Sequence, residues 1–285
     1  MQCFKKLCFK MRCSKILAGF AALIIWSAGP TKAQELFVYT EPASNMPAHS
    51  VGLRTSNWLM QEQDADGGLN YHFIPEVMWG VNKSLMLHAE GFFSNRAGRF
   101  VTEGGAVYAK YRFLSRDGDH RHFRMAAFGR ASVNNSEVHQ EEIETNGHNS
   151  GLEGGLIATQ LLHKTALNAT ASFEHAMNGD RATGEYATGL ADKAVNYTVS
   201  VGQLLLPKKY TGYGQTNLNL MLEVLGQHLS QTGRSFLDIA PSVQFIFNSQ
   251  TRVDIGYRRQ LYSTMQRTAP NGFMLRLEHL LFNAL

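Results

Sequence analysis

Residues 236–262, FLDIAPSVQFIFNSQTRVDIGYRRQLY, alternate between apolar and polar side chains in two long runs. In the first run, Leu237 and Ile239 share one parity, whereas Asp238 and Gln244 share the other. A period of two indicates a strand with one apolar and one polar face. Each run has roughly ten residues, the length a tilted strand needs to cross a bilayer, whereas ordinary strands have about five or six. The stretch therefore predicts a transmembrane β-hairpin.

The same alternation recurs in twelve segments, which are 51–60, 70–79, 84–94, 101–114, 122–132, 151–162, 165–176, 194–206, 215–227, 235–248, 251–262 and 272–282. Short links follow the even segments and most long links follow the odd ones, which is the topology of bacterial outer-membrane barrels. We therefore predict an all-β protein, a single antiparallel up-and-down transmembrane barrel of about 12 strands over residues 50–285. A soluble β-sandwich also alternates, but it would not need strands of this length.

The N-terminus reads as a secretory signal peptide over residues 1–33. A basic region precedes an apolar run at 16–28, and small residues follow at 31–33. A membrane anchor would need about twenty apolar residues, and this run is shorter. All three cysteines lie in this leader, so the mature chain has no thiol chemistry. Residues 34–49 contain two prolines and little periodicity, and we interpret them as a periplasmic N-terminal segment.

Removal of the leader changes the charge balance. Six of the 27 Lys and Arg residues lie in residues 1–33, which leaves 21 against 23 Asp and Glu and a net charge of about −2. The mature chain therefore has no basic footprint for nucleic acid. It also has no run of about eighteen apolar residues that could span as a helix. The expected partners are outer-membrane lipid, the barrel-insertion machinery and a small-molecule solute, in the outer membrane of a Gram-negative-type bacterium.

Four stretches carry a resemblance to a known family: EPASNMPAHSVGLR at 41–54, PEVMWGVNKSLMLHAEGFFSNR at 75–96, AKYRFLSRDGDHRHFRMAAFGR at 109–130 and PSVQFIFNSQTRVDIGYRRQLY at 241–262. They resemble outer-membrane β-barrel transporters named for a MetA pathway of phenol degradation. The resemblance covers nearly the whole mature chain and implies a barrel of about twelve strands that forms a substrate channel. It carries over no catalytic residue and no defined substrate.

Ionisable residues gather on the parity expected to face the lumen, because charge on the lipid face costs about 2–4 kcal/mol at the midplane for Lys or Arg. The predicted pore-lining residues are Arg54, Glu76, Glu90, Lys110, Arg112, Arg124, Arg130, Glu153, Glu174, Glu223, Asp254, Arg258, Arg276 and Glu278. In one interpretation, these charges line a water-filled path and set its selectivity. In the other, they pair across strands and close a narrow interior. We favour the pore, with residues 34–49 as a constriction.

An acidic stretch contains Glu137, His139, Glu142, Glu144 and His148. Its spacing fits neither a calcium loop nor a pair of histidine ligands, so we interpret it as a solvated outer loop. We predict no metal site and no cofactor.

Residues near the loop ends that suit hydrolysis, namely His175, Asp180, Asp192, His228 and Ser230, share no catalytic motif. We therefore predict a channel for small solutes, apolar or aromatic ones included, that works by passive diffusion, and no enzyme. The alternatives are an outer-membrane hydrolase or lipid-modifying barrel, and a structural or surface-interaction barrel.

Overall fold

The computed structural model describes residues 37–61, 68–96, 98–119, 121–177, 190–209 and 214–285, which contain twelve strands and no helix. The predicted signal peptide lies outside these residues. No helix in the described part of the chain is long and apolar enough to span a membrane. The strands are β1 (Ser50–Gln61), β2 (Leu69–Gly80), β3 (Leu85–Ser94), β4 (Val101–Gly118), β5 (Arg121–Asn134), β6 (Gly151–Leu162), β7 (Thr165–Ala176), β8 (Lys193–Leu206), β9 (Asn217–Leu229), β10 (Ser235–Phe247), β11 (Thr251–Ser263) and β12 (Asn271–Leu281).

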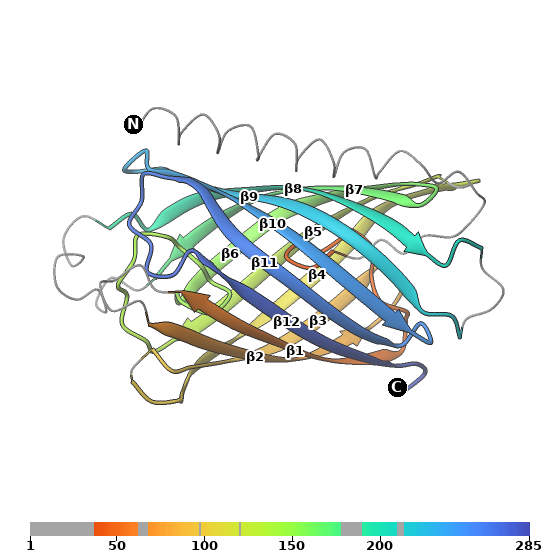
Figure 1. The fold of residues 1–285 in the computed structure, drawn as a ribbon, viewed down its shortest axis with the longest axis horizontal. Helices are drawn as coiled ribbons and strands as arrows, with labels where there is room; N and C mark the ends of the chain where they lie inside the picture. The colour runs from red at the N-terminus through yellow and green to blue at the C-terminus, as the bar shows by residue number, and fades with distance from the viewer. Residues whose placement is uncertain (1–36, 62–67, 97, 120, 178–189, 210–213) are drawn as a thin grey trace, which may run out of the picture.

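Each strand pairs with its neighbours in sequence, and β1 pairs with β12, so the sheet closes into an antiparallel barrel (Figure 1). Because the sheet is closed, each strand has a paired neighbour on both sides and no edge is open, as a barrel in lipid requires. The predicted fold class is confirmed. The predicted strand bounds are correct to within two residues, except that β4 continues four residues further, to Gly118.

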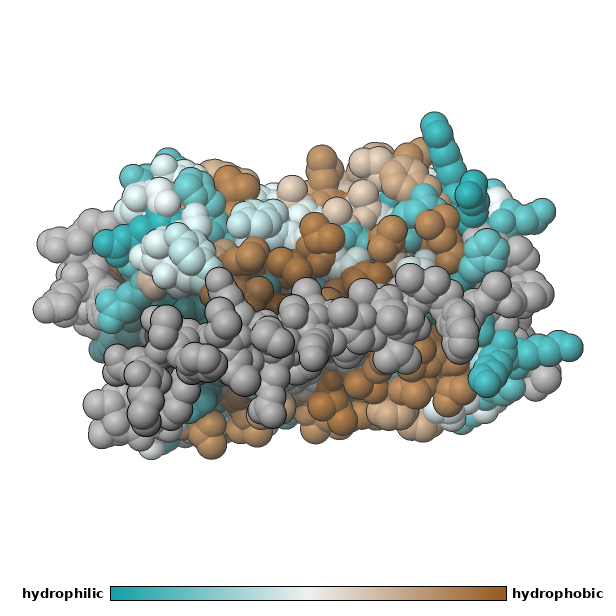
Figure 2. Space-filling model, turned by 45° about the horizontal axis from the view of Figure 1, so that its top comes forward, coloured by the Kyte–Doolittle hydropathy of each residue, from teal (hydrophilic) through white to brown (hydrophobic). Residues whose placement is uncertain are grey.

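The outer surface carries an apolar band between two polar ends (Figure 2). Aliphatic side chains in the band are largely exposed on the isolated chain, with Val107 at 61% and Val199 at 62%. Aromatic side chains flank the band, among them Trp79 and Phe113 near the short turns and Phe273 near the long loops. This arrangement is typical of a barrel surface that contacts lipid.

Two prolines interrupt the ladder on one side only. Pro75 is paired with Thr55 of β1 but has no partner on β3, and Pro241 is paired with Leu222 of β9 but has none on β11, within the described registers. A proline cannot donate a ladder hydrogen bond, so the gap falls where its nitrogen would have been the donor. Each proline is therefore accommodated by a local loss of pairing on one side of its strand.

Two non-strand segments occupy the interior. Residues 37–48, which we call the plug, lead into β1 and lie within the ring of strands (Figure 1). Residues 135–150, which we call the inner loop, connect β5 and β6 and fold in from the opposite end. Both segments contain side chains that are almost completely buried, such as Val38 in the plug and Thr145 in the inner loop.

Candidate functional site

The plug is anchored on one side by Glu223, which points inward from β9. The backbone N–H groups of Val38 and Tyr39 donate to Glu223 Oε1 at 2.9 and 2.8 Å, and that of Thr40 donates to Oε2 at 3.0 Å. The Thr40 hydroxyl adds a bond of 2.7 Å to Oε2. The two carboxylate oxygens thus satisfy three consecutive backbone donors. A buried carboxylate is tolerated only with such partners, so Glu223 and the plug depend on each other.

On the other side, the plug is held by Lys110 of β4 and Arg54 of β1. The Lys110 ammonium group donates to the Pro42 carbonyl at 2.8 Å and to the Ser44 carbonyl at 3.0 Å, and its side chain has no exposed surface. Glu41 completes the contact, because its two oxygens accept from Arg54 Nη1 at 2.7 Å and from Lys110 Nζ at 3.2 Å. Burial alone would raise the pKa of Glu41, but Arg54 and Lys110 hold it well below its usual range.

Arg54 owes its other partners to strand register. It is directly opposite Glu76 on β2 and Glu278 on β12, and it lies 3.3 Å and 2.7 Å from their carboxylates. Arg252 of β11 reaches the same Glu278 oxygen at 2.6 Å. Cross-strand pairs of opposite charge stabilise a sheet, and these pairs link the first and last strands. These ionisable side chains of β1, β2, β4, β11 and β12 therefore form one network, which includes Glu41 of the plug.

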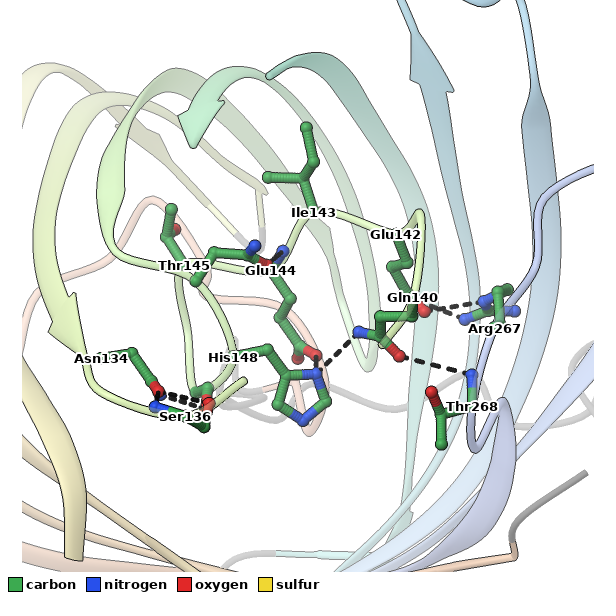
Figure 3. A network of polar contacts seen from close by, with 12 residues as sticks. Asn134, Ser136, Gln140, Glu142, Ile143, Glu144, Thr145, His148, Arg267 and Thr268 are labelled. Atoms are coloured by element: carbon green, nitrogen blue, oxygen red, sulfur yellow. Dashed lines mark hydrogen bonds and ion pairs between the residues drawn. The ribbon is translucent and has the colours of Figure 1, made fainter. Parts of the chain in front are cut away.

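The inner loop is held by a second network, at the loop end of the barrel (Figure 3). Glu142 accepts from Arg267 Nε at 2.7 Å and from Arg258 Nη2 at 2.9 Å. Both guanidinium groups also bond Asp238 of β10, at 2.6 Å from Arg258 and 2.8 Å from Arg267. The expectation of a solvated outer loop is wrong for Glu142, which is 7% exposed. The partners of Glu142 are distant in sequence, so the local sequence pattern does not predict that this loop folds into the barrel.

Further along the inner loop, two side chains of the barrel wall accept and donate bonds to its backbone. Gln227 of β9 accepts from the Ile143 N–H at 2.9 Å and donates to the Ile143 carbonyl at 2.6 Å. Glu174 of β7 accepts from the backbone N–H of Thr145 at 2.8 Å and from its hydroxyl at 2.7 Å. The loop is therefore fixed to the far wall of the lumen.

Between the plug and the inner loop lies a cavity of about 220 Å³, which we call the chamber. Its wall contains residues from the plug, the inner loop and the strands, including Tyr39, Glu41, Tyr108, Phe128, Arg130, Glu142, Glu144, Asn146, Glu153, Glu174, Asn196, Thr198, Gln227, Phe236 and Arg258. The plug and the inner loop therefore both contribute to the chamber wall inside the barrel.

The protein is similar to known proteins in its fold, whereas its sequence matches none of those compared. No family model matches the sequence, and no curated protein matches it. A solved outer membrane channel from Pseudomonas putida F1 is similar with a TM-score of 0.53 and 12% identity, over 86% of this chain and 99% of that one. The fold is that of an outer-membrane β-barrel. The β domain of the Bordetella autotransporter BrkA is a weaker match, with a TM-score of 0.42 and 13% identity over 81% of this chain and 99% of that one.

The predicted pore-lining residues take different places in this outer-membrane barrel. Those in contact with the plug or its network are Arg54, Glu76, Lys110, Arg124, Glu223, Asp254 and Glu278. Arg276 bonds the Ser56 hydroxyl of β1 at 3.1 Å. Those at the chamber or the inner loop are Arg130, Glu153, Glu174 and Arg258, while Glu90 pairs with Arg130 at 3.3 Å. Arg112 lies apart, because it bonds the Lys83 carbonyl at the exposed turn end of the barrel.

One cluster in the barrel has the composition of a metal site. Glu76, His88 and Glu90 each offer a ligand atom, and these atoms lie within 4.8 Å of one another. Arg54 and Arg130, however, bond the two carboxylates, at 3.3 Å in each case. These fixed positive charges compete with a divalent cation for the same oxygens. The cluster is better described as part of the ion-pair network.

The rim residues do not assemble a catalytic triad within the described chain. His175 lies 3.7 Å from Asp192, and His228 bonds the Ser235 hydroxyl at 2.8 Å, but no hydrogen bond between described residues joins the two pairs. A Ser-His-Asp site needs nucleophile, base and orienting carboxylate in one chain of bonds. Asp180 lies outside the described residues.

The inner loop of the barrel should respond to acid through Glu142. Burial favours a raised pKa for this carboxyl, but Arg267 and Arg258 lower it to about 2 from the ordinary value of 4.5. A lowered pKa stabilises the folded state above the ordinary value, and this stabilisation is lost as the pH falls from about 4.5 towards 2. We expect wild-type protein to lose more stability than Glu142→Gln between about pH 5 and pH 3 in denaturant titrations. Parallel curves for the two proteins would contradict this assignment.

Proposed function

We propose that the protein is an outer-membrane channel for small solutes, and that the plug and the inner loop together close its path in the conformation described here. The observation that carries this proposal is the nature of the contacts inside the barrel. Phe37, Val38 and Ile143 make apolar contacts with the wall. Many of the other contacts that hold the two segments are hydrogen bonds and ion pairs to wall side chains. Such contacts can be exchanged for water when a segment moves, so the lumen can open without unfolding the strands.

The solute class receives support from the chamber. Tyr108, Phe128 and Phe236 contribute aromatic surface to a wall that also contains aliphatic, polar and charged side chains. This combination suits a small solute with an apolar or aromatic part and a polar end. Passive diffusion, without an energy source, is the mode of movement that we propose for this solute.

The test is single-channel recording of the refolded protein in planar bilayers. We expect brief discrete openings, and a shift of ion selectivity towards cations in Arg130→Ala, which removes a positive charge from the chamber wall. Arg112→Ala is the matched control, because it removes the same charge at the exposed turn end. An effect of Arg112→Ala as large as that of Arg130→Ala would place the selective region elsewhere. A correctly folded protein that stays silent, even with the plug deleted, would overturn the channel function.

A further inference from the structure

The chamber wall carries more carboxylates than basic groups. Five glutamates line it, against the two arginines Arg130 and Arg258. Two of these glutamates are already neutralised, since Glu41 pairs with Arg54 and Lys110, and Glu142 pairs with Arg258 and Arg267. The three that remain are Glu144, Glu153 and Glu174.

Glu153 and Glu174 lie directly opposite each other on β6 and β7. Like charges in this position destabilise a sheet, so the pair needs compensation. Glu174 accepts bonds only from neutral groups among the described residues, namely Thr145, Asn196 and Gln227. Glu153 is 3.8 Å from Arg130, and that guanidinium is shared with Glu90 at 3.3 Å.

Glu144 brings a third carboxylate to the same space from the inner loop. Among the described residues it pairs with His148, whose Nδ1 lies 3.3 Å from the carboxylate, but burial holds the pKa of this imidazole well below its usual range. Burial raises the pKa of Glu144 to about 7, and the neighbouring charge of Glu142 adds to the shift. Arg258 and Arg267 oppose this shift, but burial and the charge of Glu142 outweigh them. The chamber wall thus carries three carboxyl groups, of which only Glu153 has an ion pair with an arginine among the described residues.

Unpaired acceptors point the same way. The Tyr108 hydroxyl has no hydrogen-bond partner although the residue is only 4% exposed. The Tyr39 hydroxyl, Asn146 Oδ1 and Thr198 Oγ1 are also buried without a partner, and all four residues line the chamber. Unsatisfied buried polar atoms are costly, and they gather where a ligand or water completes them. A ligand with several N–H donors satisfies them best, because each of these atoms can accept.

We propose that the chamber binds a small organic cation, an amine whose ammonium group faces Glu144, Glu153 and Glu174 while its carbon skeleton lies against Tyr108 and Phe128. Aromatic faces attract cations, which adds to the carboxylate contribution. The volume of about 220 Å³ admits a molecule the size of a single substituted ring. This proposal names the solute class of the channel proposed above and rests on that function.

The test is isothermal titration calorimetry on the full-length, folded barrel in detergent at about pH 8, where Glu144 is ionised. Three probes share one ring and differ in charge: benzylammonium, benzyl alcohol and benzoate. We expect benzylammonium to bind about tenfold or more tightly than benzyl alcohol, because a charge-assisted hydrogen bond is worth more than a neutral one. Benzoate should not bind measurably.

Two variants test the named atoms without removing any described hydrogen bond within the wall. Glu144→Gln should weaken benzylammonium about tenfold, and Tyr108→Phe, which deletes only the unpaired hydroxyl, about three- to tenfold. Glu137→Gln is the control, because it makes the same charge change in the same loop at an exposed side chain. Its affinity should equal that of wild type.

Equal affinity for benzyl alcohol and benzylammonium, or equal weakening by Glu144→Gln and Glu137→Gln, would overturn the cation site. Absence of binding to folded wild-type protein would do the same. Calorimetry needs no ion current, so this failure is separate from that of the channel. A barrel that conducts but does not prefer benzylammonium refutes only the site. A barrel that binds it and never conducts refutes only the channel.

Discussion

Deletion of residues 37–48 should convert a barrel that opens rarely into one that conducts steadily. The plug fills the lumen between Glu223 on one wall and Lys110 on the other, and its removal leaves those side chains to water. We expect larger and longer conductance steps in planar bilayers, while the strands remain intact by circular dichroism. The barrel wall closes through β1–β12 pairing, which begins after the deleted residues, so the fold should persist.

A graded version of this experiment uses Glu223→Ala. Hydrogen bonds to a charged group are each worth about 1.5–3 kcal/mol, and about 1.4 kcal/mol corresponds to a factor of ten. Loss of the acceptor for three backbone N–H groups should therefore raise the open fraction about tenfold or more. Glu137→Ala removes a carboxylate at an exposed site and should leave the open fraction unchanged. If the plug deletion conducts no better than wild type, the plug alone does not limit conduction, and the inner loop is then the segment to release.

Replacement of Arg267 by alanine is expected to free the inner loop. The Arg267 side chain is 1% exposed and bonds two carboxylates, Glu142 and the fully buried Asp238. Removal of one partner from a buried ion pair costs about 3–5 kcal/mol, because the remaining charges stay buried. Arg258 still contacts both carboxylates, so we expect a cost near the lower limit, about 3 kcal/mol.

Digestion with a glutamate-specific protease measures the release of the inner loop in Arg267→Ala directly. When reclosure is fast, cleavage follows the open population, and a cost of about 3 kcal/mol predicts roughly a hundredfold faster cutting after the buried Glu142. Arg259→Ala is the matched control, since Arg259 is the exposed neighbour of Arg258 on β11. An unchanged cleavage rate in Arg267→Ala would show that the loop is held inward by other contacts, such as those of Gln227.

The strands of the barrel wall could be predicted from the sequence because each depends on local alternation of apolar and polar residues. A strand such as β6, Gly151–Leu162, shows its period of two over its whole length, and its bounds are those expected from that pattern. The same alternation separates inward-facing from outward-facing side chains. Lys110 and Glu223, for example, lie on the inward face and are completely buried. Lipid on one side imposes this regularity on each strand separately.

The contents of the barrel were not accessible in the same way. The acidic composition of residues 137–148 is that of a solvated loop, and only the positions of Asp238, Arg258 and Arg267 explain why Glu142 is buried. Glu41 likewise gave no signal, since its partners Arg54 and Lys110 are fixed by strand register. Such contacts, which join residues 13 positions apart for Glu41 and Arg54 and 125 apart for Glu142 and Arg267, leave no period in the local sequence.

The position of Arg54 also bears on the order in which the molecule assembles. Its carboxylate partners come from β2, from β12 and from the plug, so the complete set exists only when the last strand has met the first. A nascent barrel that still lacks β12 offers the plug an incomplete receptor. The β1–β12 pairing that closes the barrel therefore also completes the binding site for the plug. A chain truncated before β12 should leave the plug exposed to protease.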